Sequence, residues 1–282
     1  MSAVVRRSRA GNLTPGKWVV WVLLVLGGIV MIFPIYWMLV TAVSSAGQAQ
    51  STGFYLWPSS THWSNFVSVW SDYPVARWAL NSVIIAVLGV VISVVISLLA
   101  GYAFAKYRFF GRDLLFVALL VTIMVPIQVV MVPEFQIVAK IGLVDSPWGV
   151  ILPRAAEAIA VFMARQFMLG IPDDLISAAR IDGASELRIF TRIVLPLSRP
   201  LIGVLVILTF VWRWNDFVWP LVALQGQNRF TLPLGLNSMH NIYSSPWQAI
   251  MAVSLVSIVP TIVVFVLFQR QFVQGIARTG LK

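Results

Sequence analysis

The stretch from Ile171 to Pro200 reads IPDDLISAARIDGASELRIFTRIVLPLSRP, and it separates two long apolar runs. It holds four of the ten acidic residues of the chain and four of its twenty Lys and Arg residues. Because the rest of the chain is mostly apolar, such a concentration of charge indicates a segment that lies outside a lipid bilayer and binds another molecule there.

The composition of the whole chain agrees with a membrane protein. Of its 282 residues, 59% are hydrophobic and 11% are charged, whereas soluble domains carry about 25% charged residues. There is no Cys, which excludes disulfides, thiolate catalysis and zinc–sulfur sites. The net charge of +10 is spread over short loops rather than gathered in one basic stripe, so no nucleic-acid partner is expected.

Six apolar runs approach or exceed the roughly 20 residues that a transmembrane helix needs. They cover residues 18–40, 78–105, 113–132, 148–169, 201–224 and 247–268. Only helices and closed barrels satisfy the backbone in lipid, and the chain lacks the repeated period-two alternation of a barrel. We therefore expect an all-α polytopic membrane protein with six transmembrane helices and a helical cytoplasmic loop at 171–200.

The first apolar run follows a basic N-terminus, as the core of a signal peptide would. Such cores contain about 7–15 apolar residues, so the longer run at 18–40 favours a retained first helix. Pro34 and the Ser/Ala-rich segment 41–50 leave a cleaved signal peptide as the open alternative.

The distribution of basic residues predicts the orientation. The N-terminus, the turn 106–112, the segment 165–199 and the C-terminal tail hold fifteen Lys and Arg residues, and the three opposite loops hold three. An excess of Lys and Arg marks the cytoplasmic side, which places both termini there. The expected organisation is a cytoplasmic N-terminus (1–17), a transmembrane domain (18–270) and a cytoplasmic tail (271–282).

The first half of the 171–200 loop has the signals of a short helix. Pro172 suits a first turn, and Asp173 and Asp174 would lie near the positive end of the helix dipole. Gly183 can adopt the left-handed conformation that ends a helix, and Asp182 can cap the helix that follows.

The second half of the loop has an apolar face at helical spacing, formed by Leu187, Phe190, Ile193 and Val194. Pro196 is expected to end this second helix, and Pro200 to open the next span. The residues alone also allow a simpler interpretation, in which an amphipathic surface helix does no more than anchor the loop to the membrane.

The loop resembles the "EAA" loop of the membrane subunits of binding-protein-dependent ABC importers. The matching residues are Ala178, Ala179, Asp182, Gly183, Ala184, Phe190, Ile193 and Pro196. One departure is Ser177, which stands where the family has its leading Glu, and Asp174 and Glu186 are the acidic residues nearby.

The resemblance extends over nearly the whole chain and is strongest to the maltose-type permeases of carbohydrate uptake. The segments that carry it are Ile32-Phe33-Pro34, Asn81-Ser82, Trp214-Asn215-Asp216-Phe217 and Phe272-Val273-Gln274-Gly275-Ile276. It implies a permease subunit that works with a second homologous permease, two ATPase subunits that form a homodimer, and an extracytoplasmic solute-binding protein.

The same resemblance implies which residues couple to the ATPase. In the loop these are Ser177, Ala178, Ala179, Asp182, Gly183, Ala184, Phe190 and Pro196, and in the tail they are Arg278 and Lys282. The chain has no Gly-x-x-x-x-Gly-Lys-Ser/Thr phosphate loop and no hydrolase motif, so it is not expected to be an enzyme. ATP and magnesium would be bound by the ATPase subunits, and no cofactor or metal by this chain.

Ionisable and amide side chains within the spans are candidates for a solute path. They are Gln128, Arg154, Glu157, Arg213, Asn215 and Asp216. Arg154 and Glu157, three residues apart, also have the spacing of an ion pair that stabilises a single helix. The group around Arg213 is bracketed by tryptophans, which favour sugar binding but also occur in helix packing and interfacial belts.

These observations predict the membrane-spanning subunit of an ATP-driven importer for a sugar or a related solute such as glycerol phosphate. The alternative is a secondary transporter or channel driven by an ion gradient, which would be built from two repeated halves that the chain does not show. A membrane-embedded enzyme is the weakest hypothesis, because no catalytic constellation is present.

Overall fold

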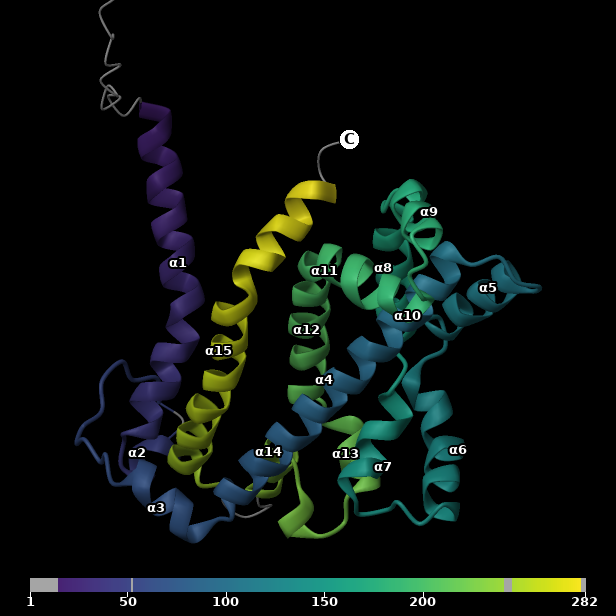
Figure 1. Ribbon diagram of the computed structural model, residues 1–282. Coiled ribbons are helices and arrows are strands. Elements are labelled where there is room, and N and C mark those ends of the chain that lie inside the picture. The colour runs from purple at the N-terminus through teal and green to yellow at the C-terminus, as the bar shows by residue number, and fades with distance from the viewer. Residues whose placement is uncertain (1–14, 52, 241–244, 280–282) are drawn as a thin grey trace, which may run out of the picture. The chain divides into compact units, whose positions relative to one another are not determined.

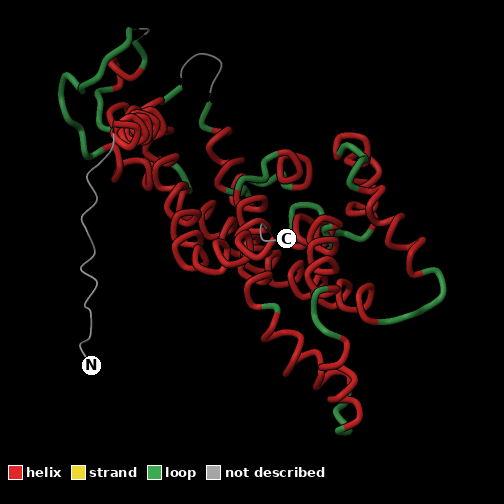
Figure 2. The backbone as a smooth tube through the Cα atoms, turned by 90° about the horizontal axis from the view of Figure 1, so that it is seen from above, coloured by secondary structure: helices red, strands yellow, loops and turns green. Residues whose placement is uncertain are grey.

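The computed structural model describes residues 15–51, 53–240 and 245–279, and this part of the chain contains helices and no strand (Figures 1 and 2). The first half contains α1 (Pro15–Ala42), α2 (Ala46–Ala49), α3 (Asn65–Asp72), α4 (Val75–Lys106), α5 (Arg112–Thr122) and α6 (Ile127–Lys140). The middle contains α7 (Pro147–Ile151), η1 (Leu152–Arg154), α8 (Ala158–Leu169), α9 (Asp173–Ile181), α10 (Glu186–Ile189), η2 (Phe190–Val194) and α11 (Leu195–Leu197). The last part contains α12 (Arg199–Trp214), α13 (Val218–Ala223), η3 (Gln227–Arg229), α14 (Leu232–Ser238) and α15 (Trp247–Thr279).

The helices confirm the all-α membrane fold. In the described ranges, three helices are long and apolar enough to cross a bilayer: residues 16–42 of α1, all of α4, and residues 247–270 of α15. Three further pairs of shorter helices pass the same test together but are bent, by 104°, 45° and 77°. Counting each bent pair as one span gives six, the predicted number, although the third pair includes residues 186–197 of the predicted cytoplasmic loop.

The third span is a bent pair, so its prediction as one helix over 113–132 is wrong. α5 ends at Thr122, and α6 begins at Ile127 after a bend of 104°. The cause is Pro126, which cannot donate a backbone hydrogen bond and disfavours helical geometry in the residue before it. α6 then continues to Lys140, so Glu134 lies on a helix and not in the predicted loop.

The fourth and fifth spans also depart from single helices. α7 and η1 meet α8 at a bend of 45°, with Ala155–Glu157 between them. α12 ends at Trp214, where a straight fifth span had been predicted to continue to Leu224. The loop expected at 225–246 contains η3 and α14, two short elements that the polar composition of this segment did not predict.

The chain divides into two compact units. The first comprises residues up to Phe66 together with Pro246–Leu255, and the second comprises Val67–Ser245 and the residues from Val256 onward. In the first unit Trp37 stacks on Phe54 with ring centroids 4.7 Å apart. All the functional candidates with described side chains lie in the second unit.

In the second unit, α4 packs against both α8 and α12. The approach to α8 is close because Gly101 faces Ala164, and a Cβ built on this glycine would lie 2.4 Å from the Ala164 Cβ. Any side chain at this position would force the helices apart, so small residues set the distance between them, as in many membrane helix pairs.

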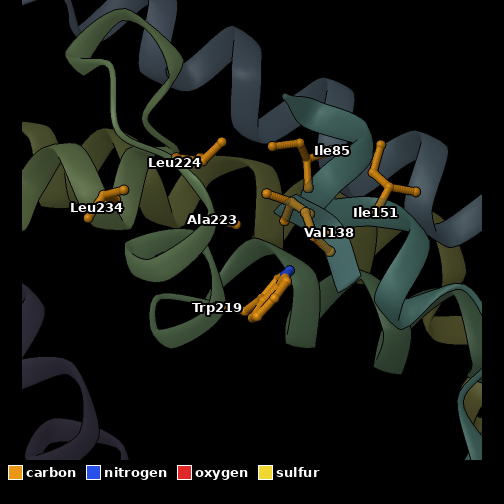
Figure 3. Packing of buried hydrophobic residues seen from close by; sticks show 8 residues of the cluster. Ile85, Val138, Ile151, Trp219, Ala223, Leu224 and Leu234 are labelled. Carbon is orange, nitrogen blue, oxygen red and sulfur yellow. The ribbon is translucent and has the colours of Figure 1, made fainter. Parts of the chain in front are cut away.

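A cluster of buried apolar side chains joins the ends of several helices in this unit (Figure 3). It consists of Ile85, Val138, Val150, Ile151, Trp219, Ala223, Leu224 and Leu234. The Trp219 indole is fully buried and donates to the Gly149 carbonyl oxygen at 3.0 Å. The cluster therefore holds α13 against α6 and α7, next to the polar residues described below.

Candidate functional site

A cavity of about 730 Å³ opens in the second unit where two of the bent spans are interrupted and α12 ends. Its walls are the break between α5 and α6, the break between η1 and α8, and the C-terminal end of α12. Five of the six predicted solute-path residues line it: Arg154, Glu157, Arg213, Asn215 and Asp216. The sixth, Gln128, is exposed on α6 and is not part of the wall.

Arg213 is the most buried charged residue of the cavity, with 5% of its side chain exposed. Its Nη2 donates to the Arg154 carbonyl oxygen and lies 3.4 Å from Glu157 Oε1. Gly89 of α4 makes room for it, because a Cβ there would lie 2.6 Å from the Arg213 Cδ. The charge on Arg213 is thus held between α4, η1 and α8.

The structure gives Arg154 and Glu157 different ion-pair partners from the one predicted. The interpretation as a pair within one helix is wrong, because Arg154 ends η1 and Glu157 precedes α8. Arg154 Nη2 lies 3.9 Å from Glu134 Oε2 on α6, and its guanidinium lies 5.9 Å from the centre of the Trp219 ring. Charges on four separate elements therefore meet at the cavity.

Glu134 is the residue that sequence reasoning missed. It was assigned to a short loop because the third span was expected to end at Val132. The available signal was an acidic residue inside the apolar stretch 127–139, which is unusual for a membrane helix without a functional or pairing role.

Asn215 and Asp216 lie in the turn that ends α12. The Asn215 amide donates to the Val211 carbonyl oxygen at 2.8 Å, and Asp216 Oδ1 accepts from the Trp219 backbone N–H at 3.4 Å. Of the flanking tryptophans, Trp212 lines the cavity with 48% exposure. Trp214 is buried, and its indole N–H donates to the Ser257 carbonyl oxygen at 2.9 Å. The ring of Trp212 is therefore available to a solute, whereas the ring of Trp214 is used in packing.

The polar atoms of the cavity are not all paired with one another. Among the described residues that line the cavity, four buried atoms lack a hydrogen-bond partner: Arg154 Nε, Arg154 Nη2, Glu157 Oε2 and Arg213 Nε. Buried polar atoms normally have a partner in the protein or in ordered water. A cavity of this size with both unpaired donors and an unpaired acceptor has the chemistry to hold a hydroxyl-rich molecule or its water.

The second predicted site is the loop at 171–200, and its first half matches the prediction. α9 begins at Asp173 directly after Pro172, and Gly183 has a φ of 77°, in the left-handed region that glycine adopts without strain. Ser177 and Ala178 are exposed, and Ala179 and Ala184 are half-buried. The predicted coupling residues thus present small side chains on an accessible helix.

Two details of the second half, its cap and its buried face, differ from the prediction. The cap of α10 is Ser185, whose hydroxyl accepts from the Arg188 N–H at 3.4 Å, and not Asp182, which ends α9. Leu187 is 71% exposed, so it does not belong to the buried face. That face consists of Ile189, Phe190 and Val194.

The sequence predicts that Pro196 ends the second helix, but in the structure Pro196 lies inside α11. The turn before it, η2, is a π-helix in which the Leu195 N–H donates to the Phe190 carbonyl oxygen. A proline cannot donate to the carbonyl four residues earlier and its ring crowds that carbonyl. The wider π turn accommodates this, so the helix continues to Leu197 with a local distortion.

The start of the loop is tied to the end of α4. Lys106 Nζ donates to the Ile171 carbonyl oxygen and to Asp173 Oδ1, both at 2.6 Å. The hydrogen bond and charge of Lys106 hold the pKa of the Asp173 carboxyl below its usual value. The tail candidates Arg278 and Lys282 have side chains that lie outside the described residues.

Comparison with known proteins identifies the family. The model of the family described as "Binding-protein-dependent transport system inner membrane component" matches residues 93–278. The chain is 35% identical over 254 residues to the arabinooligosaccharides transport system permease protein AraQ of Bacillus subtilis (strain 168), with 89% of this chain and 90% of the relative covered. It is 34% identical over 263 residues to the sn-glycerol-3-phosphate transport system permease protein UgpE of Yersinia pestis bv. Antiqua (strain Antiqua), with 90% and 94% covered.

The fold also has a counterpart among solved structures. A chain of a bacterial ABC transporter involved in the import of the acidic polysaccharide alginate is similar with a TM-score of 0.80. The similarity covers 95% of this chain and 100% of that chain at 24% sequence identity. The chain belongs to the family of binding-protein-dependent transport system inner membrane components, and it is a membrane-spanning permease subunit of an ABC importer.

Proposed function

We propose that this permease passes a hydroxyl-rich solute, a sugar or a polyol derivative, through the cavity at the interrupted spans. The observation that carries the proposal is the convergence of Arg154, Glu157, Arg213 and Asp216 on one cavity beside Trp212. Sugars combine hydroxyl groups, which pair with such donors and acceptors, with apolar ring faces, which pack on aromatic side chains. The names of the two relatives, which refer to arabinooligosaccharides and glycerol phosphate, agree with this class.

The 171–200 loop is proposed as the docking site of an ATPase subunit. Its accessible surface is formed by small residues, Ser177 and Ala178, and by two exposed apolar side chains, Leu175 (47%) and Ile181 (87%). Exposed apolar side chains on a short cytoplasmic helix are typical of a surface that a partner covers.

The missing Glu at position 177 has a candidate replacement. Asp174 is exposed on α9, and it has no hydrogen bond or ion pair among the described residues. Of the other three acidic residues of the loop, Glu186 is held by Arg180 and Asp173 by Lys106, both at 2.6 Å, and Asp182 lies beyond the end of the helix that contains position 177. A charge contact with the ATPase would therefore involve Asp174.

The remaining partners follow from this assembly. Two ATPase subunits, which bind ATP and magnesium, require two docking loops, so a second homologous permease supplies the other loop. An extracytoplasmic binding protein delivers the solute, and no cofactor is needed on this chain. The charge distribution supports placing both termini and the 171–200 loop in the cytoplasm.

Reconstitution tests the proposal. We expect the chain, co-expressed with a second permease, an ATPase and a binding protein from the same organism, to purify in mild detergent as one complex. In liposomes, this complex should take up a sugar or polyol only when ATP and the binding protein are both present. Uptake driven by an ion gradient through this chain alone would instead support the secondary-transporter hypothesis, for which family membership gives no ground.

A further inference from the structure

The connection between α9 and α10 is a tight turn at Gly183. The Gly183 N–H donates to the Arg180 carbonyl oxygen at 3.0 Å, and the Ala184 N–H donates to the Ala179 carbonyl oxygen at 2.9 Å. Apart from Gly183 and its two chain neighbours, no heavy atom lies within 4 Å of the position that a Gly183 Cβ would occupy. Gly183 supplies no side chain that could hold the two helices at this hinge, so side-chain contacts across it must come from the flanking residues.

One carboxylate spans the hinge. Arg180 Nε donates to Glu186 Oε1 at 2.6 Å, and Arg180 Nη2 donates to Glu186 Oε2 at 3.3 Å. This bidentate geometry fixes both the distance and the orientation between a guanidinium and a carboxylate. The two side chains are 42% and 46% exposed, so the pair by itself contributes little stability.

The same carboxylate reaches a third element. The Tyr107 hydroxyl, directly after the end of α4, donates to Glu186 Oε2 at 2.5 Å, and the Tyr102 hydroxyl lies 3.5 Å from it. Burial and the Glu186 acceptor raise the pKa of Tyr107, so its hydroxyl keeps the proton that it donates. Tyr102 is 5% exposed and packs on Phe190, with ring centroids 5.3 Å apart.

α4 leads from this contact to the cavity. Tyr102 and Gly89 are thirteen residues apart on one unbroken helix, a distance of about 20 Å at 1.5 Å per residue. Gly89 contacts the Arg213 side chain. A displacement of the loop that carries α4 with it would therefore change the packing around Arg213.

We propose that Glu186 is a positioning residue that joins α9, α10 and the cytoplasmic end of α4 into one rigid body, through Arg180 and Tyr107. This inference rests on the proposed docking of an ATPase at the loop. It assigns to Glu186 the transmission of the ATPase movement to α4, which is a different role from contacting the ATPase. Without the carboxylate, α9 would pivot at Gly183, and ATP would be hydrolysed with less solute moved.

The test measures solute moved per ATP hydrolysed by the complete complex in liposomes. For Glu186→Ala we expect the ratio to fall by about fivefold, at the low end for coupling between two sites. Tyr107→Phe keeps the ring and removes one hydroxyl, so its ratio should fall less. The double variant should resemble Glu186→Ala, because the Tyr107 hydroxyl acts through the carboxylate.

Asp113→Asn is the matched control. Its carboxylate also pairs with an arginine, Arg112, at 2.9 Å, and is 75% exposed, but it does not contact the loop. We expect the wild-type ratio from this control. Glu186→Gln is made in parallel in case the complex that contains Glu186→Ala does not assemble. The glutamine amide oxygen can still accept a hydrogen bond from Tyr107, but the negative charge that faces Arg180 is lost.

The outcomes separate the two proposals. A wild-type ratio in both Glu186→Gln and Tyr107→Phe, or an equal fall in the Asp113 control, overturns the positioning role of Glu186. A wild-type complex that retains no ATPase and shows no ATP-driven uptake overturns the proposed function itself. A lowered ratio in the Glu186 and Tyr107 variants, with the control unchanged, supports the inference.

Discussion

At the scale of single residues, the cavity of this permease contains charged groups that are paired across elements. Arg213 is held by Glu157 and by the Arg154 carbonyl, and Arg154 in turn faces Glu134. Desolvating such groups is costly, and removing one partner leaves the other uncompensated. The pairs therefore depend on one another more strongly than surface ion pairs do.

Replacing Arg213 tests this dependence. Arg213→Ala leaves Glu157 buried without its partner, and we expect a loss of about 3 kcal/mol in unfolding free energy, the low end for a broken buried pair. A thermal unfolding scan of the detergent-solubilised protein should show a lowered Tm. Arg188→Ala, at an exposed arginine with no ion pair among the described residues, should leave the Tm within the error of the scan. An equal Tm for both variants would refute the structural weight given to Arg213.

Gly89 gives a second prediction at this scale. Gly89→Ala places a Cβ 2.6 Å from Arg213 Cδ, so the arginine side chain must shift away from Glu157. We expect a lowered Tm and slower solute uptake, although alanine is the better helix former by about 1 kcal/mol. Gly28→Ala in α1, where nothing lies within 4 Å of the new Cβ, is the control and should not be destabilised.

At the scale of elements, the 171–200 loop is two helical segments separated by a single left-handed residue. Gly183 has a φ of 77°, which costs an ordinary L-residue roughly 1–2 kcal/mol. The strain would either distort the turn or change the angle between α9 and α10. The angle matters because both helices are attached to the end of α4.

Gly183→Val should therefore uncouple the complex without preventing its insertion. We expect ATP hydrolysis to continue while ATP-driven uptake in liposomes falls severalfold. Gly183→Asn should retain most uptake, since asparagine tolerates the left-handed region better than other residues. Unchanged uptake in Gly183→Val would contradict the role of the turn.

At the scale of the molecule, the number of spans was predictable and their shape was not. Long apolar runs such as that of α4 predict a span by length alone. The bends at Pro126 and at Ala155–Glu157 lie inside apolar stretches, where a proline or small residue indicates a kink but not its angle. The ion-pair partners were likewise hidden, because Glu134, Arg154 and Arg213 are distant in sequence and meet only through the bends.

The predicted orientation can be tested on the whole chain, because it contains no cysteine that would add background labelling. A membrane-impermeant maleimide added outside intact cells should label Ser60→Cys, in a loop assigned to the outer side. It should label Phe110→Cys, which lies in the basic turn and is fully exposed, only after the membrane is opened. The reverse pattern would invert the topology and move the 171–200 loop out of reach of an ATPase.

The bent spans have a consequence for how the protein enters the membrane. α5 and α6 have 11 and 14 residues, or about 16 and 21 Å of helix, against a hydrocarbon layer of about 30 Å. Neither half can cross alone, and the backbone ends at the break cannot face lipid. α5 and α6 must therefore enter the membrane together with other helices. α4, which precedes them in the chain, would insert first and provide the surface on which they assemble as they leave the translocation machinery.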